Sequence, residues 1–196
     1  MAASELEARV ARAIELVVEA RYPMALVGAG ISVESGIPPF RGPGGLWTKY
    51  GEPEMDGYRR LLEDPRKWWL DRLKQEGPGA EFHETFQQAK PNAGHVALAE
   101  METMGYMKYI ITQNVDNLHQ EAGSQRVAEI HGNMTKLRCI GCNTRWHQDE
   151  FRIEDYPPLC PHCGGIVKDD TVMFGEPIPV DVLQVCQGES SKCDCM

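Results

Sequence analysis

The sequence predicts an α/β fold built on a parallel, doubly wound sheet, and three observations support this expectation. Short apolar runs typical of buried strands occur at Met24–Val27, Tyr106–Thr112 and Val127–His131. Helical patterns lie between them, which gives the order strand, helix, strand, helix, strand. The first run ends at Gly28-Ala29-Gly30, and a strand that ends in glycines is a usual place for a nucleotide-binding turn.

The helices are predicted from apolar spacing and from end signals. Residues 5–21 carry an apolar stripe with charges on the other face, so a helix should precede the first strand. The stretch from Asn92 to Glu102 has a helical pattern that Gly105 closes. Val180–Cys186 is the last expected helix.

Two segments are expected to depart from this alternation. Gly36 to Gly51 is dense in glycine and proline, which predicts a long loop. Residues 58–90 predict a small subdomain of two short helices around a break at Gly77-Pro78-Gly79. We interpret its neighbouring Trp68 and Trp69 as core packing rather than as a binding platform, because one of two adjacent aromatic side chains on a short helix usually packs inward.

The composition is that of a globular protein, with 42% hydrophobic and 25% charged residues. No apolar run approaches the roughly 20 residues that a membrane-spanning helix needs, and the N-terminus lacks the layout of a signal peptide. We therefore expect a cytoplasmic protein with no membrane partner. The net charge of −9 argues against nucleic-acid binding, because such binding depends largely on lysine and arginine.

Four of the seven cysteines form two Cys-x-x-Cys pairs: Cys139, Cys142, Cys160 and Cys163. Their spacing predicts a zinc ribbon, and redox pairs or free thiols are the alternative. Four thiolates complete a tetrahedral site, so the predicted zinc ion is structural rather than catalytic. We interpret His147 and His162 as bystanders, because the cysteines already fill the site.

The glycine turn alone is weak support for a nucleotide site, because Val33 stands where the usual fingerprint has a third glycine. The strand that precedes the turn strengthens the prediction of a nucleotide site. Residues 32–35 are also expected to begin a helix whose N-terminal amides face an anion.

The segment from Gly28 to Gly42 closely resembles the cofactor-loop signature of sirtuins, the NAD-dependent protein-lysine deacylases. Three further landmarks follow in the family order: Thr112–His119, His131-Gly132 and Phe174-Gly175-Glu176-Pro177. The resemblance runs from about Arg12 to the last residue.

This resemblance implies a division of the chain. Residues 1–57 and 91–136 would form a Rossmann-like NAD-binding domain, residues 58–90 a small helical subdomain, and residues 137–170 the zinc ribbon. Residues 171–196 would return to the Rossmann-like domain. Sirtuins continue with further strands after this point, so we expect the sequence to be a C-terminally truncated fragment with little activity of its own.

The resemblance also implies roles for single residues. His131 would be the catalytic base, since a neutral imidazole can accept a proton from a ribose hydroxyl. NAD, consumed as a co-substrate, would contact residues from three segments: Gly28, Ala29, Gly30, Ser32, Ile37, Phe40, Arg41, Gln113, Asn114 and Asp116. Acylated-lysine protein substrates would contact Phe174, Gly175 and Glu176. The products would be nicotinamide, free lysine and acyl-ADP-ribose.

Two other functions remain open: mono-ADP-ribosyl transfer from the same NAD, and a non-enzymatic zinc-ribbon binding module with a vestigial nucleotide fold. The intact His131 favours deacylation, whereas His95 and His119 are interpreted as packing or capping residues. Residues 70–75 lack the tyrosine and arginine, three residues apart, of sirtuins that prefer acidic acyl groups. This absence favours acetyl or longer apolar acyl groups.

Overall fold

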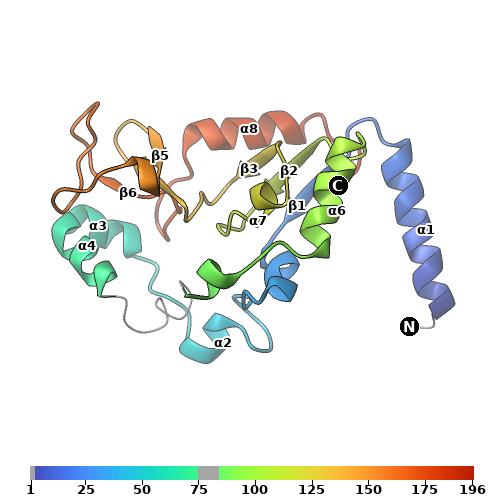
Figure 1. Cartoon of the computed structure of the whole chain (residues 1–196), viewed down its shortest axis with the longest axis horizontal. Coiled ribbons are helices and arrows are strands. Elements are labelled where there is room, and N and C mark those ends of the chain that lie inside the picture. The colour runs from blue at the N-terminus through green and yellow to red at the C-terminus, as the bar shows by residue number, and fades with distance from the viewer. Residues whose placement is uncertain (1–2, 75–83) are drawn as a thin grey trace.

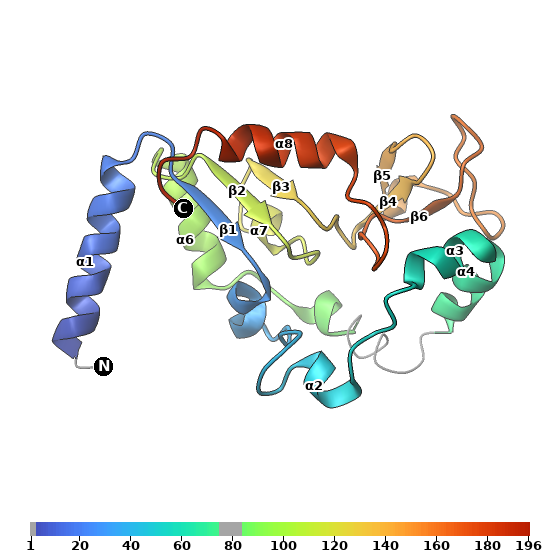
Figure 2. The same ribbon diagram turned by 180° about the vertical axis from the view of Figure 1, so that it is seen from behind.

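The computed structural model describes residues 3–74 and 84–196, and a parallel three-stranded sheet lies at its centre (Figures 1 and 2). Its strands are β1 (Met24–Val27), β2 (Tyr109–Thr112) and β3 (Val127–Glu129), in the spatial order β1-β2-β3. The predicted parallel α/β sheet is therefore confirmed.

The register of the sheet brings the carboxyl ends of its strands together. Val27 lies opposite Thr112, and Thr112 lies opposite Glu129 in the next strand. Because parallel strands point the same way, the residues that follow each strand meet at one edge of the sheet. Open α/β sheets bind their ligands at this edge.

The last residues of the chain lie beside β1, on the side that β2 does not occupy. The Met24 N–H donates to the Cys195 carbonyl at 2.9 Å, and the two segments run parallel there. The Asp194 carboxylate accepts hydrogen bonds from the backbone N–H groups of Arg21 and Tyr22. The end of the chain thus forms a single parallel bridge beside the amino end of β1, which is the edge strand of the sheet.

Helices lie on both sides of this sheet. α8 (Val180–Ser190) packs on one face, as Figure 1 shows, and contributes to a buried cluster of Met24, Ile111, Ala128 and Cys186. α6 (Ala93–Thr103) lies behind the sheet in Figure 2, next to α7 (Leu118–Glu121). α1 (Ala3–Glu19) stands apart from the sheet in both views, and the apolar stripe that predicted it is exposed. None of the helices in the described residues is long and apolar enough to cross a membrane.

The second strand begins later than the sequence predicts. Gly105 closes α6 with a φ of 84°, as expected for a left-handed end residue. The N–H groups of Tyr106 and Met107 then both donate to the Met101 carbonyl. This turn uses backbone groups that a strand would need, so β2 begins at Tyr109.

Two other expectations are also corrected. β3 ends at Glu129 rather than at His131, because Gly132 turns the chain with a φ of 78° and donates its N–H to the Glu129 carbonyl. The segment predicted as a loop contains a short helix, α2 (Leu46–Tyr50). The N–H groups of Leu46 and Trp47, the first two residues of α2, donate to the carbonyls of Pro39 and Phe40. These bonds cap the short helix.

A second, antiparallel sheet forms a small module at the end of the molecule opposite α1 (Figure 1). β4 (Lys136–Cys139) lies between β5 (Arg145–His147) and β6 (Val167–Asp169), and η2 (Gln148–Glu150) follows β5. Its core consists of Trp69, Leu137, Cys139, Cys160 and Val167.

Helices α3 (Gly57–Glu63) and α4 (Pro65–Leu73) lie beside this module in both views. Trp69 of α4 is 6% exposed and donates its indole N–H to the Val167 carbonyl at 3.0 Å. The interpretation of the tryptophan pair as core packing is therefore confirmed. The predicted break at Gly77-Pro78-Gly79 lies outside the described residues.

Four sulfur atoms converge within the module: the Sγ atoms of Cys139, Cys142, Cys160 and Cys163 all lie within 4.8 Å of one another. Two of these separations are 3.5 and 3.7 Å. A tetrahedron with metal–sulfur bonds of about 2.3 Å has edges of about 3.8 Å, so the cluster fits one zinc ion.

Glycines let the two Cys-x-x-Cys turns of this cluster approach each other. A Cβ atom on Gly165 would lie 3.0 Å from the Cys139 sulfur and 3.2 Å from the Cys163 sulfur. The N–H groups of Gly141 and Gly165 also point at cysteine sulfurs, at 3.3 and 3.4 Å, which favours thiolates. The metal-ligand cluster in the described residues contains neither His147 nor His162.

A buried charge cluster joins this module to the rest of the molecule. Its ion pairs are Arg138–Asp170, Arg138–Glu176, Lys168–Glu176, Arg145–Asp170, Arg145–Asp181 and Arg72–Asp169. Burial raises the pKa of the Asp170 carboxyl although two arginines face it, and burial lowers the pKa of the Lys168 ammonium. The desolvation cost is thus large, and removing one partner should be strongly destabilising.

We predict that Cys139→Ser abolishes zinc binding and lowers the free energy of unfolding by roughly 3 kcal/mol or more, because structural zinc binds small modules with about 10–16 kcal/mol. Elemental analysis and thermal melting measure the two effects. Cys193→Ser is the matched control, since Cys193 lies outside the sulfur cluster. Equal zinc loss in both variants would contradict the assignment.

We also predict that Gly132→Ala is destabilising by roughly 2 kcal/mol or more, because strained and overpacked positions carry costs of this size. A Cβ atom there would lie 1.9 Å from the Asp170 carbonyl oxygen, and φ is +78°. Gly188→Ala, at an open position of α8, should instead stabilise by roughly 0.5–1 kcal/mol. Denaturant unfolding compares the variants, and equal midpoints would exclude this packing.

Candidate active site

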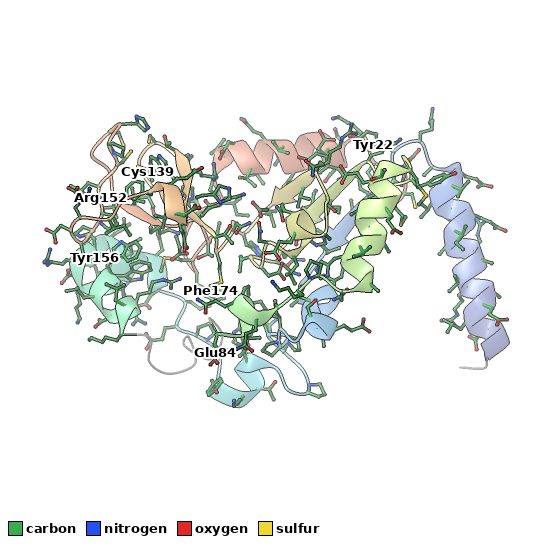
Figure 3. The ribbon with its side chains drawn as sticks, viewed as in Figure 1. Tyr22, Glu84, Cys139, Arg152, Tyr156 and Phe174 are labelled. Carbon is green, nitrogen blue, oxygen red and sulfur yellow. The ribbon has the colours of Figure 1, made fainter. Side chains whose placement is uncertain are left out.

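One cavity of about 1580 Å³ lies at the carboxyl edge of the parallel sheet. Residues that follow each of the three strands line it, namely Ala29 after β1, Gln113 after β2 and His131 after β3. Figure 3 shows Phe174, which also lines the cavity, in the middle of the molecule between the module that holds Cys139 and the larger sheet. Typical single-ligand pockets measure about 300–1,000 Å³, so this cavity has room for two ligands.

The glycine turn enters the cavity at the end of β1. Gly28 is extended, and the short 3₁₀ helix η1 (Ala29–Ser35) follows it where the sequence predicts a helix start at residue 32. A Cβ atom on Gly30 would meet nothing within 4 Å, so the backbone there borders open space. The turn can therefore accept a ligand close to its main chain.

Ser32, Asn114 and Asp116 come together beneath the turn. The Ser32 hydroxyl donates to the Asp116 carboxylate at 2.6 Å, and the Asn114 side-chain amide donates to the Ser32 oxygen at 3.0 Å. The Asn114 amide also donates to the Gly28 carbonyl at 3.2 Å. These contacts connect the loops after β1 and β2, so the predicted residues form one network that fixes the turn.

Sequence reasoning missed Asn92 as a member of this region. Its side chain caps α6 by accepting the N–H of Gly94 at 2.9 Å, and donates to the Ile31 carbonyl at 2.7 Å and the Ser35 hydroxyl at 2.9 Å. The capping role had a sequence signal, because asparagine is a preferred N-cap residue. The contact with η1, 61 residues away, had none.

His131 is half-buried at the end of β3, and its Nδ1 lies 3.1 Å from the Gln113 carbonyl oxygen. A carbonyl oxygen only accepts hydrogen bonds, so Nδ1 carries the proton and Nε2 keeps a free lone pair when the ring is neutral. The Gln113 N–H is itself bonded to the Val27 carbonyl at 3.0 Å. The sheet edge thus fixes the orientation of the imidazole and leaves Nε2 without a proton in the neutral ring.

His95 and His119 have different surroundings from His131. Both are buried, at 0% and 1% exposure, and their rings meet edge to face at 4.9 Å. Burial lowers the pKa of both rings, and the neighbouring His95 contributes to a pKa of about 4 for His119. Both histidines are therefore neutral at physiological pH, and neither lines the cavity.

The loop that contains Ile37, Phe40 and Arg41 was predicted to close over the cofactor. It is buried at Ile37, and it contacts aromatic side chains at Phe40 and Arg41. Ile37 is buried beside Leu118, whereas Phe40 and Arg41 are exposed cavity-lining residues. Trp47 of α2 lies between Phe40 and Phe174, with ring centroids 5.4 and 6.0 Å away. The Arg41 guanidinium lies 4.5 Å over the Trp47 ring.

The predicted substrate residues divide into two groups. Phe174 is 39% exposed, and Gly175 turns the chain beside it with a φ of 82°. The Glu176 carboxylate, by contrast, is 2% exposed and is held by Arg138 and Lys168. Its side chain thus contacts the module rather than open space.

We predict that the protein loses stability as the pH falls from about 6.5 towards 4, through His119. The folded residue has a pKa of about 4, whereas an unfolded histidine titrates near 6.5. The unfolded state therefore binds more protons in this window, which amounts to up to roughly 3 kcal/mol.

His119→Gln, which does not titrate, should flatten this dependence. The measurement is the free energy of unfolding at pH 7 and at pH 5 for both proteins, with the zinc content checked at each pH because thiolates also protonate. Identical pH slopes would show that His119 is not responsible.

Comparisons with known proteins agree with this geometry. The chain matches the Sir2 family over residues 28–196. It is 42% identical over 168 residues to the NAD-dependent protein deacylase 2 of Pyrobaculum aerophilum, covering 84% of this chain and 63% of that protein. It is 41% identical over 192 residues to the NAD-dependent protein deacylase of Thermococcus kodakarensis, covering 93% and 70%. The chain thus spans a little under two thirds of the first relative's length.

Solved structures show the same likeness. A Sir2 homologue in complex with NAD superimposes with a TM-score of 0.71 at 37% identity, covering 93% of this chain and 69% of that one. A complex of Sir2, p53 peptide and NAD⁺ gives a TM-score of 0.66 at 36% identity, covering 91% and 70%. The family match, the similar folds and the ordered site residues lead to one conclusion: the chain belongs to the Sir2, or sirtuin, family.

Proposed function

We propose that the protein is an NAD-dependent protein-lysine deacylase that releases nicotinamide, deacylated lysine and O-acyl-ADP-ribose. The observation that carries this proposal is the orientation of His131, whose Nδ1–H is used by the Gln113 carbonyl. A fixed base at the edge of a two-ligand cavity suits the transfer of an acyl group between two bound substrates. The relatives named NAD-dependent deacylases support the same reading.

NAD fits the residues present. The open backbone at Gly30 gives a diphosphate close access to the turn, and glycine turns after a first parallel strand serve this purpose in dinucleotide sites. When bound, NAD supplies the ribose carbon that receives the acyl oxygen and the nicotinamide that leaves. The network of Ser32, Asn114 and Asp116 holds the turn in place, so the binding surface is formed in advance.

The remaining residues have separate tasks in this proposal. His131 Nε2 takes the proton of a ribose hydroxyl, while its Nδ1–H remains on the Gln113 carbonyl and fixes the ring. Phe40 covers the reacting end of the cofactor and excludes water from it. Phe174 and Gly175 border the path of the acyl-lysine side chain, next to the Trp47 ring.

We further propose that the four-cysteine site holds zinc for folding alone. Four thiolates leave no position for a substrate, so no step of the reaction passes through the metal. A cytoplasmic location is consistent with this assignment, because none of the seven cysteines forms a disulfide and reducing conditions preserve thiolate sites.

A form of the protein that also carries the strands that sirtuins have after this segment should convert NAD and an acetyl-lysine peptide into nicotinamide, free lysine peptide and O-acetyl-ADP-ribose, which mass spectrometry detects. Nicotinamide release with ADP-ribose attached to protein would instead indicate ADP-ribosyl transfer. Absence of both NAD binding and turnover would favour a non-enzymatic module.

We predict that, in the extended form, His131→Ala lowers kcat by about 100-fold or more, because general-base assistance typically contributes factors of 10²–10⁴. Binding of ADP-ribose, measured by calorimetry, should change less than about twofold, since the base acts after the nucleotide is bound. His147→Gln, at an exposed residue outside the cavity, is the matched control and should keep full activity. Unchanged turnover in His131→Ala would assign the base to another residue.

A further inference from the structure

Glu176 lies in a segment that borders the cavity, but its carboxylate is bonded inside the protein. Arg138 donates from Nη2 to one carboxylate oxygen, and the Lys168 ammonium lies 3.1 Å from the other. All three side chains are 3% exposed or less. Arg138 belongs to β4 and Lys168 to β6, so Glu176 is held by the central strand of the zinc module and its neighbour.

Lys168 fixes the segment at two further points. Its ammonium donates to the carbonyl oxygens of Asp169, at 2.9 Å, and of Thr171. An ammonium group has three donors, and these two carbonyls together with Glu176 account for all of them. The backbone at residues 169–171 and the carboxylate of Glu176 are therefore tied to one buried atom.

Glu176 also closes the turn that carries Phe174. Its second carboxylate oxygen accepts the Met173 N–H at 2.9 Å, and its own N–H donates to the Met173 carbonyl at 3.0 Å. The turn is tight, because a Cβ atom on Gly175 would lie 3.2 Å from the Met55 carbonyl. The carboxylate thus sets the position of the turn at the cavity wall.

The same segment contacts the proposed base. The Val172 N–H donates to the His131 carbonyl at 2.8 Å. Gly132 is pressed so closely against the Asp170 carbonyl that a Cβ atom would lie 1.9 Å from it. Movement of residues 170–172 would therefore displace the backbone of His131.

We propose that Glu176 is a positioning residue: held by Arg138 and Lys168, it fixes the Asp170–Glu176 segment against His131 and sets the wall of the acyl-lysine path. This inference rests on the proposed deacylase function. In this proposal Glu176 acts by holding other residues in place and does not contact the substrate. The module of β4, β5 and β6, which contains the four cysteines, then supports the cavity wall.

The test compares Glu176→Gln with Val167→Ala. Glutamine keeps the size of the side chain and an oxygen for the Met173 N–H, but it removes the negative charge that faces both Arg138 and Lys168 and leaves Arg138 with Asp170 alone. Val167 is fully buried in the same module and carries no charge, so its truncation lowers stability without touching the cluster. Both variants are assayed well below their Tm, with the zinc content measured.

In Glu176→Gln we expect kcat/KM for the acetyl-lysine peptide to fall by about 10- to 100-fold, because displacement of about 1 Å in an active site costs factors of this size. ADP-ribose affinity should stay within about twofold, and the ring signals of His131 in NMR spectra should shift. Val167→Ala should change neither kcat/KM nor those signals.

The proposal is overturned if Glu176→Gln, folded and loaded with zinc, keeps kcat/KM and the His131 signals unchanged, or if Val167→Ala loses as much activity. If Glu176→Gln does not fold, Glu176→Asp retains the charge but shortens the reach, and the same two readouts apply to it. Absence of deacylase activity in the wild-type form extended through the further sirtuin strands would refute the proposed function, whereas the His131 signals would still test the coupling.

Discussion

The position of the cavity wall depends on the charge cluster that joins the small antiparallel sheet to the segment after it. Arg138 and Lys168 project from the module, and Asp170 and Glu176 lie on the connecting segment. Arg145 extends the cluster to Asp181 at the start of α8. Since a buried pair of this kind costs much desolvation energy, its value lies in fixing one arrangement rather than in adding stability. The cluster thereby fixes the position of the antiparallel sheet relative to the parallel sheet.

The second constraint is the parallel direction of the three central strands. Because each strand ends at the same edge, residues more than 80 positions apart meet there, as Ser32 and Asp116 do. The cavity lies at that edge, where open α/β sheets bind their ligands. The zinc cluster contributes to this geometry indirectly, by shaping the module that holds Arg138 and Lys168.

Three histidines show how surroundings decide the chemistry of one residue type. His95 and His119 lie in a buried pair, where desolvation keeps both rings neutral and removes them from proton exchange near pH 7. His131 is half-buried, has one ring nitrogen hydrogen-bonded to a backbone carbonyl and is one of the residues that line the cavity. The first two are consistent with a packing role and the third with a base, although all three lie near the ends of regular elements.

The sequence by itself determined what depends on residues close together in the chain. The two Cys-x-x-Cys pairs, the glycine turn after β1 and the strand–helix alternation are all local patterns, and they were enough to predict the fold class and the metal cluster. The family came from the resemblance of four short motifs, which are local as well. The helix that begins after Asn92 was predicted for the same reason.

Only the tertiary structure decided the contacts between distant segments. The bond from Asn92 to η1, the burial of Glu176 against Arg138 and Lys168, and the return of Cys195 to β1 join residues separated by many positions. Spacing and propensity carry no information about such pairs, because they form through packing of whole elements. Glu176 is the clearest case: its motif places it at the cavity, whereas its desolvated carboxylate requires the two cations of the module.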